Sequence, residues 1–298
     1  MPESQIKVQL NPDVTPAGSD LSIVNAARRS FNTRSEWANA EDLWIEPYVP
    51  LGIGFGDEVR FEMINPYIKP VLKDKDKRLL EFLARGMTAD DFDNFLVDIS
   101  IADMGWSWYK ESPESLKKLL WQWRNTPTHD TPFNHTFISF EVQAPIFVRA
   151  QLVKHEYLIM SEFSRRYITD DVQFYKPDYW RKAADDKKQG SLNEPHETWN
   201  HGVGTGYLDQ VYETQDDCLG LFNEMVSCGV APEQARMLLP QSTMTEWTWS
   251  GTLGAFAKMC TLRLHPEAQY EARLVAEQVY GYLKEYYPVG AKALVEGV

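Results

Sequence analysis

Residues 136–148 read TFISFEVQAPIFV, and the interpretation of the fold starts from this stretch. Apolar and polar residues alternate at its start, and it is rich in β-branched and aromatic residues. Both features are typical of a strand. Pro145 interrupts the strand, because proline has no amide hydrogen to donate to a sheet. From about Val148 to Phe163 the apolar spacing becomes helical, so we predict a helix there. One face of that helix would carry Gln151, His155, Leu158 and Glu162.

Elements on either side of this stretch are predicted from caps, breakers and amphipathic spacing. Asp20 caps a helix over 21–31, and residues 171–180 are extended. Residues 182–200 are polar and charged, which indicates an exposed loop. We predict further helices at 74–86, 112–125, 207–228, 232–239, 251–264 and 266–286, the last ended by Pro288. The expected fold class is α/β of the α+β type, a twisted sheet with packed helices.

The composition limits the class of protein. The chain has 298 residues, of which 43% are hydrophobic, so it can bury a large core. Its formal net charge of −13 disfavours a protein that coats nucleic acid. The three cysteines form no C-x-x-C pair, so we expect neither a disulfide framework nor a metal. The start does not resemble a secretory signal, and no apolar run approaches about 18 residues. We therefore predict a cytoplasmic protein that does not enter membranes.

Two groups of arginines suggest an anionic ligand. The segment SEFSRRY (161–167) places two serine hydroxyls, a carboxylate and two adjacent arginines together. Arginine forks and hydroxyls suit a phosphate group, while an ordinary surface network of Arg and Glu is the alternative. Arg236 and Arg263 lie within apolar stretches that we predict as helices. Each could pair structurally, or both could converge on one anion.

Several longer motifs occur in one order along the chain. They are LSIVNAARRSF (21–31), HDTPFNHTFISFEVQAPIFVRAQLVKHEYLIMSEFSRRY (129–167), VQFYKP (172–177) and SCGVAPEQARMLLPQSTMTEWTWSGTLGAFAKMCTLRLHPEAQYEARLVAEQV (227–279). In this combination and spacing the chain resembles the flavin-dependent thymidylate synthases over most of its length. The most specific pieces are PIFVRAQ, SRRY, ARMLLP and LRLHPEAQYE.

The resemblance implies a mixed α/β subunit with the fold of a thymidylate synthase complementing protein, in one catalytic domain over residues 1–298. It also implies a homotetramer whose active sites lie where subunits meet. The implied reaction is reductive methylation of dUMP to dTMP. Methylenetetrahydrofolate supplies the carbon, and FAD reduced by NADPH supplies the hydride. Residues at about 44–110 are extra relative to a minimal family member, so we predict an insertion there.

Position by position, the resemblance carries roles onto this sequence. The implied substrate-binding residues are Gln151, Glu162, Ser164, Arg165, Arg166, Arg236 and Arg263. The implied catalytic residues are Arg263, Ser164 and His135. Held against the pyrimidine, Arg263 would stabilise negative charge that builds on the ring, and His135 would lie near the flavin and the folate. The implied cofactor-binding residues are Ser30, Lys154, His155, Glu156, Glu162, Thr252, Lys258 and Leu262.

The flavin side of the pattern is altered in this chain. Where the family has Arg-His-Arg, residues 154–156 read Lys-His-Glu, and the glutamate would repel a pyrophosphate. Gly254 occupies the position at which the family has a second arginine that binds the flavin cofactor. FAD bound in an altered way, aided by Lys154, Lys258 or the insertion, is the leading interpretation. The alternatives are a C5 methyl- or hydroxymethyltransferase for another pyrimidine nucleotide, and a non-catalytic nucleotide-binding homologue.

Overall fold

The computed structural model describes residues 5–38, 48–53, 59–63, 70–85, 129–184, 191–196, 199–200 and 205–296. The chain divides into two compact units, one of Met1–Ser19 with Phe133–Val298 and one of Asp20–Pro132. The helix predicted at 112–125 and much of the insertion predicted at 44–110 lie outside the described residues. None of the described helices is long and apolar enough to cross a membrane.

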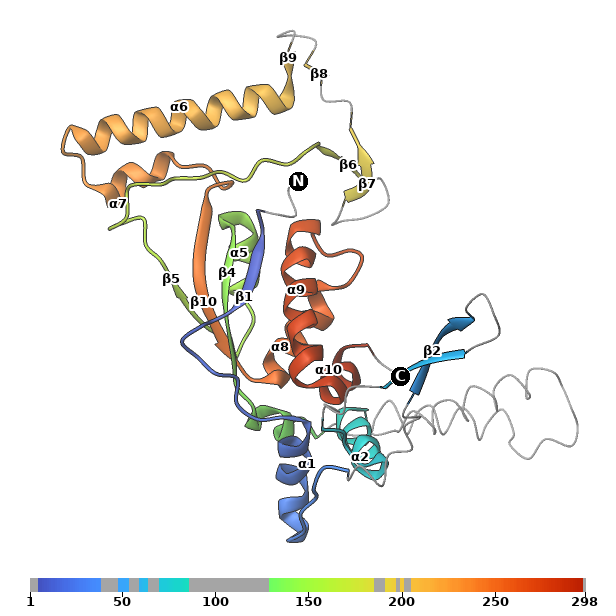
Figure 1. Cartoon of the computed structure of the whole chain (residues 1–298). Helices are drawn as coiled ribbons and strands as arrows, with labels where there is room; N and C mark the ends of the chain where they lie inside the picture. Colours follow the sequence, from blue (N-terminus) through green and yellow to red (C-terminus); the bar gives the residue numbers. More distant parts are fainter. Residues whose placement is uncertain are drawn as a thin grey trace, which may run out of the picture. The chain divides into compact units, whose positions relative to one another are not determined.

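The first unit is built on an antiparallel sheet in the order β1-β4-β10-β5 (Figure 1). Its strands are β1 (Lys7–Leu10), β4 (Ile138–Pro145), β10 (Met244–Gly251) and β5 (Ile159–Glu162). Across the sheet, Val8 lies opposite Val142, which lies opposite Trp247, which lies opposite Glu162. β4 confirms the strand predicted within TFISFEVQAPIFV, and Pro145 is its last residue.

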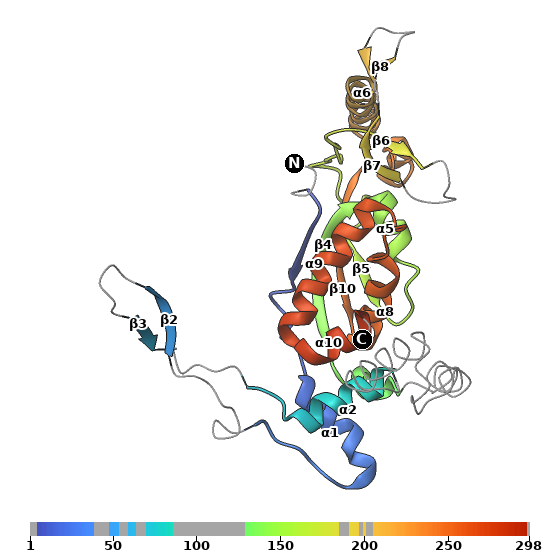
Figure 2. The ribbon, with the colours of Figure 1, turned by 90° about the vertical axis from the view of Figure 1, so that its right-hand side faces the viewer.

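Three helices of this unit lie together on one side of the sheet (Figure 2). They are α8 (Leu253–Arg263), α9 (Tyr270–Tyr286) and α10 (Pro288–Val295). Phe256 of α8 meets Phe140 of β4 and Trp249 of β10 edge to face, with ring centroids 5.0 and 5.3 Å apart. All three rings are fully buried, so the core of the unit lies between sheet and helices.

The other helices of the first unit follow the predicted breakers. α5 (Ile146–Leu152) comes directly after β4. α6 (Tyr207–Ser227) ends before Gly229, whose φ of 89° is the left-handed backbone that glycine adopts at helix ends. α7 (Pro232–Ala235) and the 3-10 segment η5 (Arg236–Leu238) occupy the helix predicted at 232–239. α8 and α9 confirm the helices predicted at 251–264 and 266–286.

The helix predicted over 148–163 is wrong beyond Leu152. Tyr157 adopts a φ of 66°, and the chain then enters the sheet as β5 beside β10. Apolar spacing over so few residues does not distinguish a strand from a helix, and the pairing with β10 decides the outcome. Gly251 of β10 permits the approach, because a Cβ there would lie 2.5 Å from Leu158 Cδ2. Gln151 and Glu162 therefore do not share a helix face.

Other elements differ from the predictions. The exposed loop predicted at 182–200 instead contributes strands to two short hairpins. In the first, β6 (Arg181–Ala183) pairs with β7 (Ser191–Pro195), and in the second β8 (Trp199–Asn200) pairs with β9 (Thr205–Gly206), which follows the predicted loop. β1, β10 and α10 are not predicted from the sequence. Pro288 ends α9 as predicted, but it also begins α10, because a proline is tolerated in the first turn of a helix.

The second unit confirms two predicted helices. α1 (Asp20–Arg28) continues into the 3-10 segment η2 (Arg29–Phe31), and α2 (Asp74–Arg85) matches the segment predicted at 74–86. Between them in the sequence, β2 (Tyr48–Ile53) and β3 (Val59–Met63) form an antiparallel hairpin.

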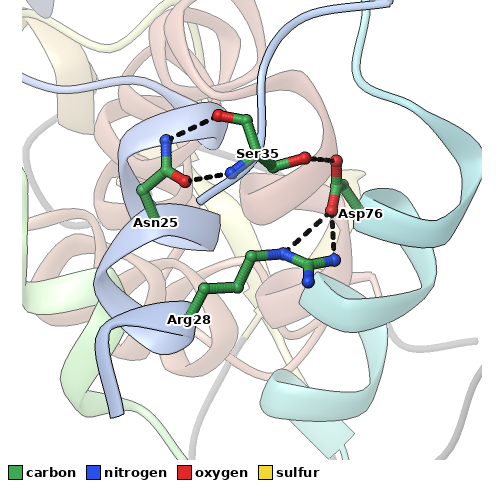
Figure 3. A network of polar contacts seen from close by, with 4 residues as sticks. All are labelled: Asn25, Arg28, Ser35 and Asp76. Atoms are coloured by element: carbon green, nitrogen blue, oxygen red, sulfur yellow. Dashed lines mark hydrogen bonds and ion pairs between the residues drawn. The ribbon is translucent and has the colours of Figure 1, made fainter. Parts of the chain in front are cut away.

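A buried polar network joins α1 to α2 (Figure 3). The carboxylate of Asp76 is fully buried, and its Oδ1 accepts hydrogen bonds from Arg28 Nη2 at 2.6 Å and Nε at 3.2 Å. The other oxygen of Asp76 accepts from the Ser35 hydroxyl. The Asn25 side chain accepts from the Ser35 amide at 2.7 Å and donates to its carbonyl at 3.2 Å. Because a buried carboxylate needs charge and hydrogen bonds around it, this network specifies how the segment after η2 packs against both helices.

Candidate functional site

A cationic cavity of about 410 Å³ lies where β5 ends, and we call it the arginine cavity. Besides Thr245, its polar lining consists of Glu162, Ser164, Arg165, Arg166 and Arg236. The first four come from the end of β5 and the turn that follows, while Arg236 begins η5. The structure therefore brings five of the expected substrate-binding residues into one cavity, from two segments far apart in the sequence.

Two arginines of the arginine cavity keep their terminal nitrogens available. Ser164 Oγ accepts hydrogen bonds from the Arg166 amide at 3.3 Å and from Arg166 Nε at 3.2 Å. Arg236 Nε donates to the carbonyl oxygen of Glu233 at 3.2 Å. Among the residues that the structure describes, the Nη atoms of Arg166 and Arg236 form no hydrogen bond or ion pair with a protein group, while the Arg166 guanidinium lies 5.1 Å from the centre of the Tyr167 ring. Both guanidinium groups are exposed, so their forks can reach an anion.

Arg165 supports the same turn instead of offering a fork. Its guanidinium donates to the carbonyl oxygens of Asp170 at 2.6 Å and Asp171 at 3.1 Å. It also lies 4.7 Å from the centre of the Phe163 ring. Burial lowers the pKa of Arg165, while the nearby Asp171 and Asp170 carboxylates oppose that effect. Arg165 thus holds the turn that carries Ser164 and Arg166.

Glu162 is held by two neighbours. Arg149 Nη2 of α5 forms an ion pair with Glu162 Oε2 at 2.7 Å, and the Thr245 hydroxyl donates to Oε1 at 2.8 Å. Both carboxylate oxygens therefore have a protein donor. Arg149 is not among the expected site residues, although it is the arginine of the PIFVRAQ motif, which is the sequence signal that could have indicated it.

A second cluster forms around Arg263, in the last turn of α8. Arg263 Nε donates to His155 Nε2 at 3.0 Å, and Nη2 donates to the carbonyl oxygen of Gln151 at 3.0 Å. Burial, and then the charge of Arg263, lowers the pKa of His155 from 6.5 to about 4. His155 is therefore neutral near pH 7, and its Nε2 can accept the hydrogen bond. This contact joins an expected catalytic residue to an expected cofactor residue.

A larger cavity of about 580 Å³, which we call the amide cavity, lies beside Gln151. Aromatic walls come from Phe147, Tyr175, Tyr179 and Trp180, and glutamine side chains of several segments also line it. It adjoins the arginine cavity, since Ile146 and Leu239 line one and their chain neighbours Phe147 and Pro240 line the other. No sequence pattern predicts this cavity, although two of its residues, Gln269 and Glu271, belong to the LRLHPEAQYE motif.

The expected cofactor residues near Arg263 are mostly at the surface. Lys154, Glu156 and Lys258 are exposed, and Leu262 is 62% exposed. Tyr157 and Ile159, which follow His155 and Glu156 in the sequence, are 78% and 69% exposed. An apolar surface next to a neutral histidine and a guanidinium fits a flavin ring. The expected cationic residues here are the lysines Lys154 and Lys258, and Glu156 among them carries the opposite charge.

The side chain of Asn134 lies against the start of α8. The Thr252 hydroxyl accepts from the Ala255 amide at 3.2 Å as the helix cap, and it donates to Asn134 Oδ1 at 2.7 Å. A Cβ on Gly254 would lie 2.5 Å from the same Asn134 oxygen. The position at which the family resemblance expects an arginine therefore has no room for a side chain while Asn134 stays in place.

Two expected residues lie outside these clusters. His135 is exposed at the end of the 3-10 segment η4 (Thr131–His135). Ser30 belongs to the second unit, where its hydroxyl donates to the Ala27 carbonyl oxygen at 3.0 Å. In the described part of the chain, no group of three or more His, Cys, Asp or Glu side chains could hold a metal ion.

The mixed helix and sheet fold and the clustered motif residues are the features by which this chain can be compared with known protein families. The family model of the thymidylate synthase complementing protein matches residues 14–289, so the chain belongs to that family. A "Flavin-dependent thymidylate synthase" of Thermus thermophilus is 34% identical over 168 residues. That match covers 56% of this chain and 60% of the relative's own length. A protein of the same name from Thermosipho africanus is 30% identical over 178 residues, which cover 60% of this chain and 76% of the relative.

Solved structures share the fold over nearly the whole chain. A UMP/dUMP methylase, PolB, from Streptomyces cacaoi bound with 5-Br UMP aligns with a TM-score of 0.61 and 20% identity. The alignment covers 97% of this chain and 93% of that chain. The same methylase bound with 5-Br dUMP gives a TM-score of 0.59 and 22% identity over the same shares. The expected fold class is thereby confirmed.

Proposed function

We propose that this chain is an FAD-dependent thymidylate synthase that methylates dUMP reductively to dTMP. Methylenetetrahydrofolate would be the carbon donor, and FAD reduced by NADPH the hydride source. The observation that carries the proposal is the arginine cavity beside the cluster of Gln151, His155 and Arg263. Family membership and the names of the relatives support it.

The arginine cavity suits the phosphate of the nucleotide. Arg166 and Arg236 present guanidinium forks, and Ser164 keeps its hydroxyl hydrogen for a ligand oxygen. Charge-assisted hydrogen bonds of this kind bind a phosphate oxygen firmly and fix its position. Binding the unreactive end of the substrate would orient the base for the reaction. Ser164 acts here as a ligand contact, because no base hydrogen-bonds its hydroxyl among the described residues.

The cluster around Arg263 suits the pyrimidine ring. Bond formation at C5 of uracil requires electron density to move onto that carbon and negative charge to develop on the ring oxygens. A guanidinium already held by His155 and by the Gln151 carbonyl does not have to reorganise as that charge appears. Arg263 would therefore stabilise the reacting ring, and His155 would keep the guanidinium in place.

FAD would supply the hydride that converts the transferred carbon to a methyl group. His155, Tyr157 and Leu262 would contact the flavin ring, with Lys154 and Lys258 near its diphosphate. Thr252 and Ser30 are further proposed cofactor contacts, and His135 would lie near the folate. A homotetramer with active sites shared between subunits, located in the cytoplasm, completes the proposal.

Glu156 offers a test of where the diphosphate lies. Glu156→Arg should tighten FAD binding at least about tenfold, because a repelling carboxylate becomes a charge-assisted donor. Quenching of FAD fluorescence measures the affinity without turnover. Glu285→Arg, an equal charge change in α9, is the matched control and should leave the affinity unchanged. Equal tightening in both variants would show an effect of net charge alone.

A second candidate is C5 methyl or hydroxymethyl transfer to another pyrimidine nucleotide, or nucleotide binding without catalysis. The observations that favour it are the exposed Glu156 and the closed position of Gly254, which remove two cations from the flavin side. The two candidates predict different behaviour with dUMP in the same assay.

The deciding experiment is release of tritium from C5-labelled dUMP by the purified protein. Methylenetetrahydrofolate and NADPH are supplied, with and without FAD. Release that requires FAD supports the proposed reaction. If no tritium is released although dUMP still binds, the result would contradict the proposed reaction and support the second candidate.

A further inference from the structure

Four side chains form a hydrogen-bond relay along the wall of the amide cavity. Arg181 Nη2 donates to Glu271 Oε1 at 2.7 Å. Gln269 Nε2 donates to Glu271 Oε2 at 3.1 Å. Gln151 Nε2 donates in turn to Gln269 Oε1. The relay runs from the hairpin strand β6, through the start of α9, to α5, and it ends on an expected substrate-binding residue.

The direction of every hydrogen bond in the relay follows from Glu271. Its side chain is 5% exposed, and its carboxylate also receives the Tyr175 hydroxyl at 3.5 Å, so three donors converge on it. A carboxylate paired with Arg181 accepts hydrogen bonds and donates none. Gln269 must therefore turn its NH₂ group toward Glu271 and its oxygen toward Gln151. This oxygen accepts from the NH₂ group of Gln151, so Gln151 has to present its own oxygen elsewhere.

The outward atom of Gln151 is consequently an acceptor. In the described part of the chain, Gln151 Oε1 has no hydrogen-bond partner, and the residue lines the amide cavity. An isolated glutamine could rotate its amide by about 180° and present a donor at little cost. Here the rotation would set the Gln151 oxygen against the Gln269 oxygen and break the hydrogen bond between the two amides.

We propose that Gln269 and Glu271 are positioning residues that make Gln151 read the N3–H group of uracil. The inference rests on the proposed function, because it assumes that the base of the nucleotide reaches Gln151. Uracil carries a hydrogen on N3 and satisfies a fixed acceptor. Cytosine has an unprotonated N3, so two acceptors would face each other and both would lose their hydrogen bonds with water. The relay would therefore select uracil nucleotides over cytosine nucleotides.

The test compares equilibrium binding of dUMP and dCMP by calorimetry at neutral pH, without cofactor or turnover. The wild-type protein should bind dUMP at least about tenfold more tightly than dCMP. Gln269→Leu removes the group that orients Gln151, so the preference should fall to about twofold or less. Glu271→Gln keeps an acceptor for Arg181 but can also donate to Gln269, so the preference should fall there too.

Gln278→Leu, within the helix α9 that Gln269 precedes, is the matched control. Gln278 accepts from the Val8 amide at 2.9 Å and donates to the Ile6 carbonyl oxygen at 3.1 Å, which anchors β1. This variant should lower the melting temperature while keeping the full preference for dUMP. A merely structural role of Gln269 would make the two leucine variants alike.

The outcomes separate the relay from the proposed function. A wild type that prefers dUMP, with Gln269→Leu keeping that preference, would overturn the relay alone. Equal loss of the preference in Gln278→Leu would also overturn the relay. A wild type that binds neither nucleotide would overturn the proposed function and the relay with it. Collapse of the preference in Gln269→Leu, with the control unaffected, supports the relay.

Discussion

Single charged groups at this site gain their properties from what surrounds them. Arg263 and Arg236 are both arginines in apolar sequence, yet Arg263 is held by His155 and by a backbone carbonyl, while Arg236 has an exposed fork. An arginine can thus stabilise a charge that develops on the pyrimidine ring, as proposed for Arg263, or bind the permanent charge of a phosphate, as proposed for Arg236.

Arg236→Gln should weaken dUMP binding about 10- to 100-fold, because one charge-assisted hydrogen bond to the phosphate is lost. Deoxyuridine, which lacks the phosphate, should bind the variant and the wild type equally, and calorimetry measures both. Arg273→Gln is the control, since Arg273 lies on α9 and donates to the Pro266 carbonyl oxygen. Equal weakening of deoxyuridine would place Arg236 away from the phosphate.

His155 should make stability depend on pH. Its pKa is lowered from 6.5 to about 4 in the folded protein, so the unfolded chain binds the proton first as the pH falls. The resulting stabilisation is present above about pH 6.5 and is lost between that pH and about pH 4. His155→Asn keeps an acceptor for Arg263 but does not titrate, so its melting temperature should fall less than that of the wild type between about pH 7 and pH 4.5. Parallel curves would contradict the shifted pKa.

At the scale of elements, the start of α8 depends on a glycine. Gly254→Ala should destabilise the protein by about 1–3 kcal/mol in urea unfolding, because its Cβ would meet Asn134 Oδ1. Gly220→Ala, in the interior of α6, meets nothing within 4 Å and should be neutral or stabilising, since alanine favours helix. Adding Asn134→Ala should recover stability in the Gly254 variant. Failure of that rescue would mean that another contact is responsible.

The junction between α1 and α2 depends on Asp76. Asp76→Asn leaves the Arg28 guanidinium without its countercharge and should lower the opening free energy of both helices by about 2–3 kcal/mol. Hydrogen exchange of the α1 and α2 amides measures this change. Asp74→Asn on the same helix removes an exposed pair with Lys77 and should leave the exchange rates unchanged. Similar effects from both variants would show that the burial of Asp76 is unimportant.

The elements also show where sequence patterns stop being informative. α6 has a long amphipathic pattern and a glycine stop, so its bounds follow from the chain alone. β5 is four residues long, and its apolar spacing suits a helix equally well. It is a strand because β10 offers an edge there and Gly251 lets the chain approach. β10 itself carries polar residues on its open face, which conceals a central strand.

At the scale of the whole molecule, topology assembles the site from remote segments. β10 pairs with both β4 and β5, which brings the turn after β5 next to η5, and the end of α8 contacts α5 through the hydrogen bond from Arg263 to the Gln151 carbonyl oxygen. The arginine cavity and the cluster around Arg263 both result from this arrangement. The molecule carries a formal charge of −13, so attraction of a nucleotide depends on these local cations and not on the overall field.

The sequence by itself determined the family, the α+β class, most helices and the set of residues expected at the site. These follow from motif order, from apolar periodicity and from helix breakers, all of which are local properties of the chain. The tertiary structure decided that 159–162 is a strand, that Gly254 faces Asn134 and that Glu271 orients Gln269 and Gln151. These features could not be predicted, because strand pairing, steric room and the direction of a hydrogen bond depend on partners that only folding brings together.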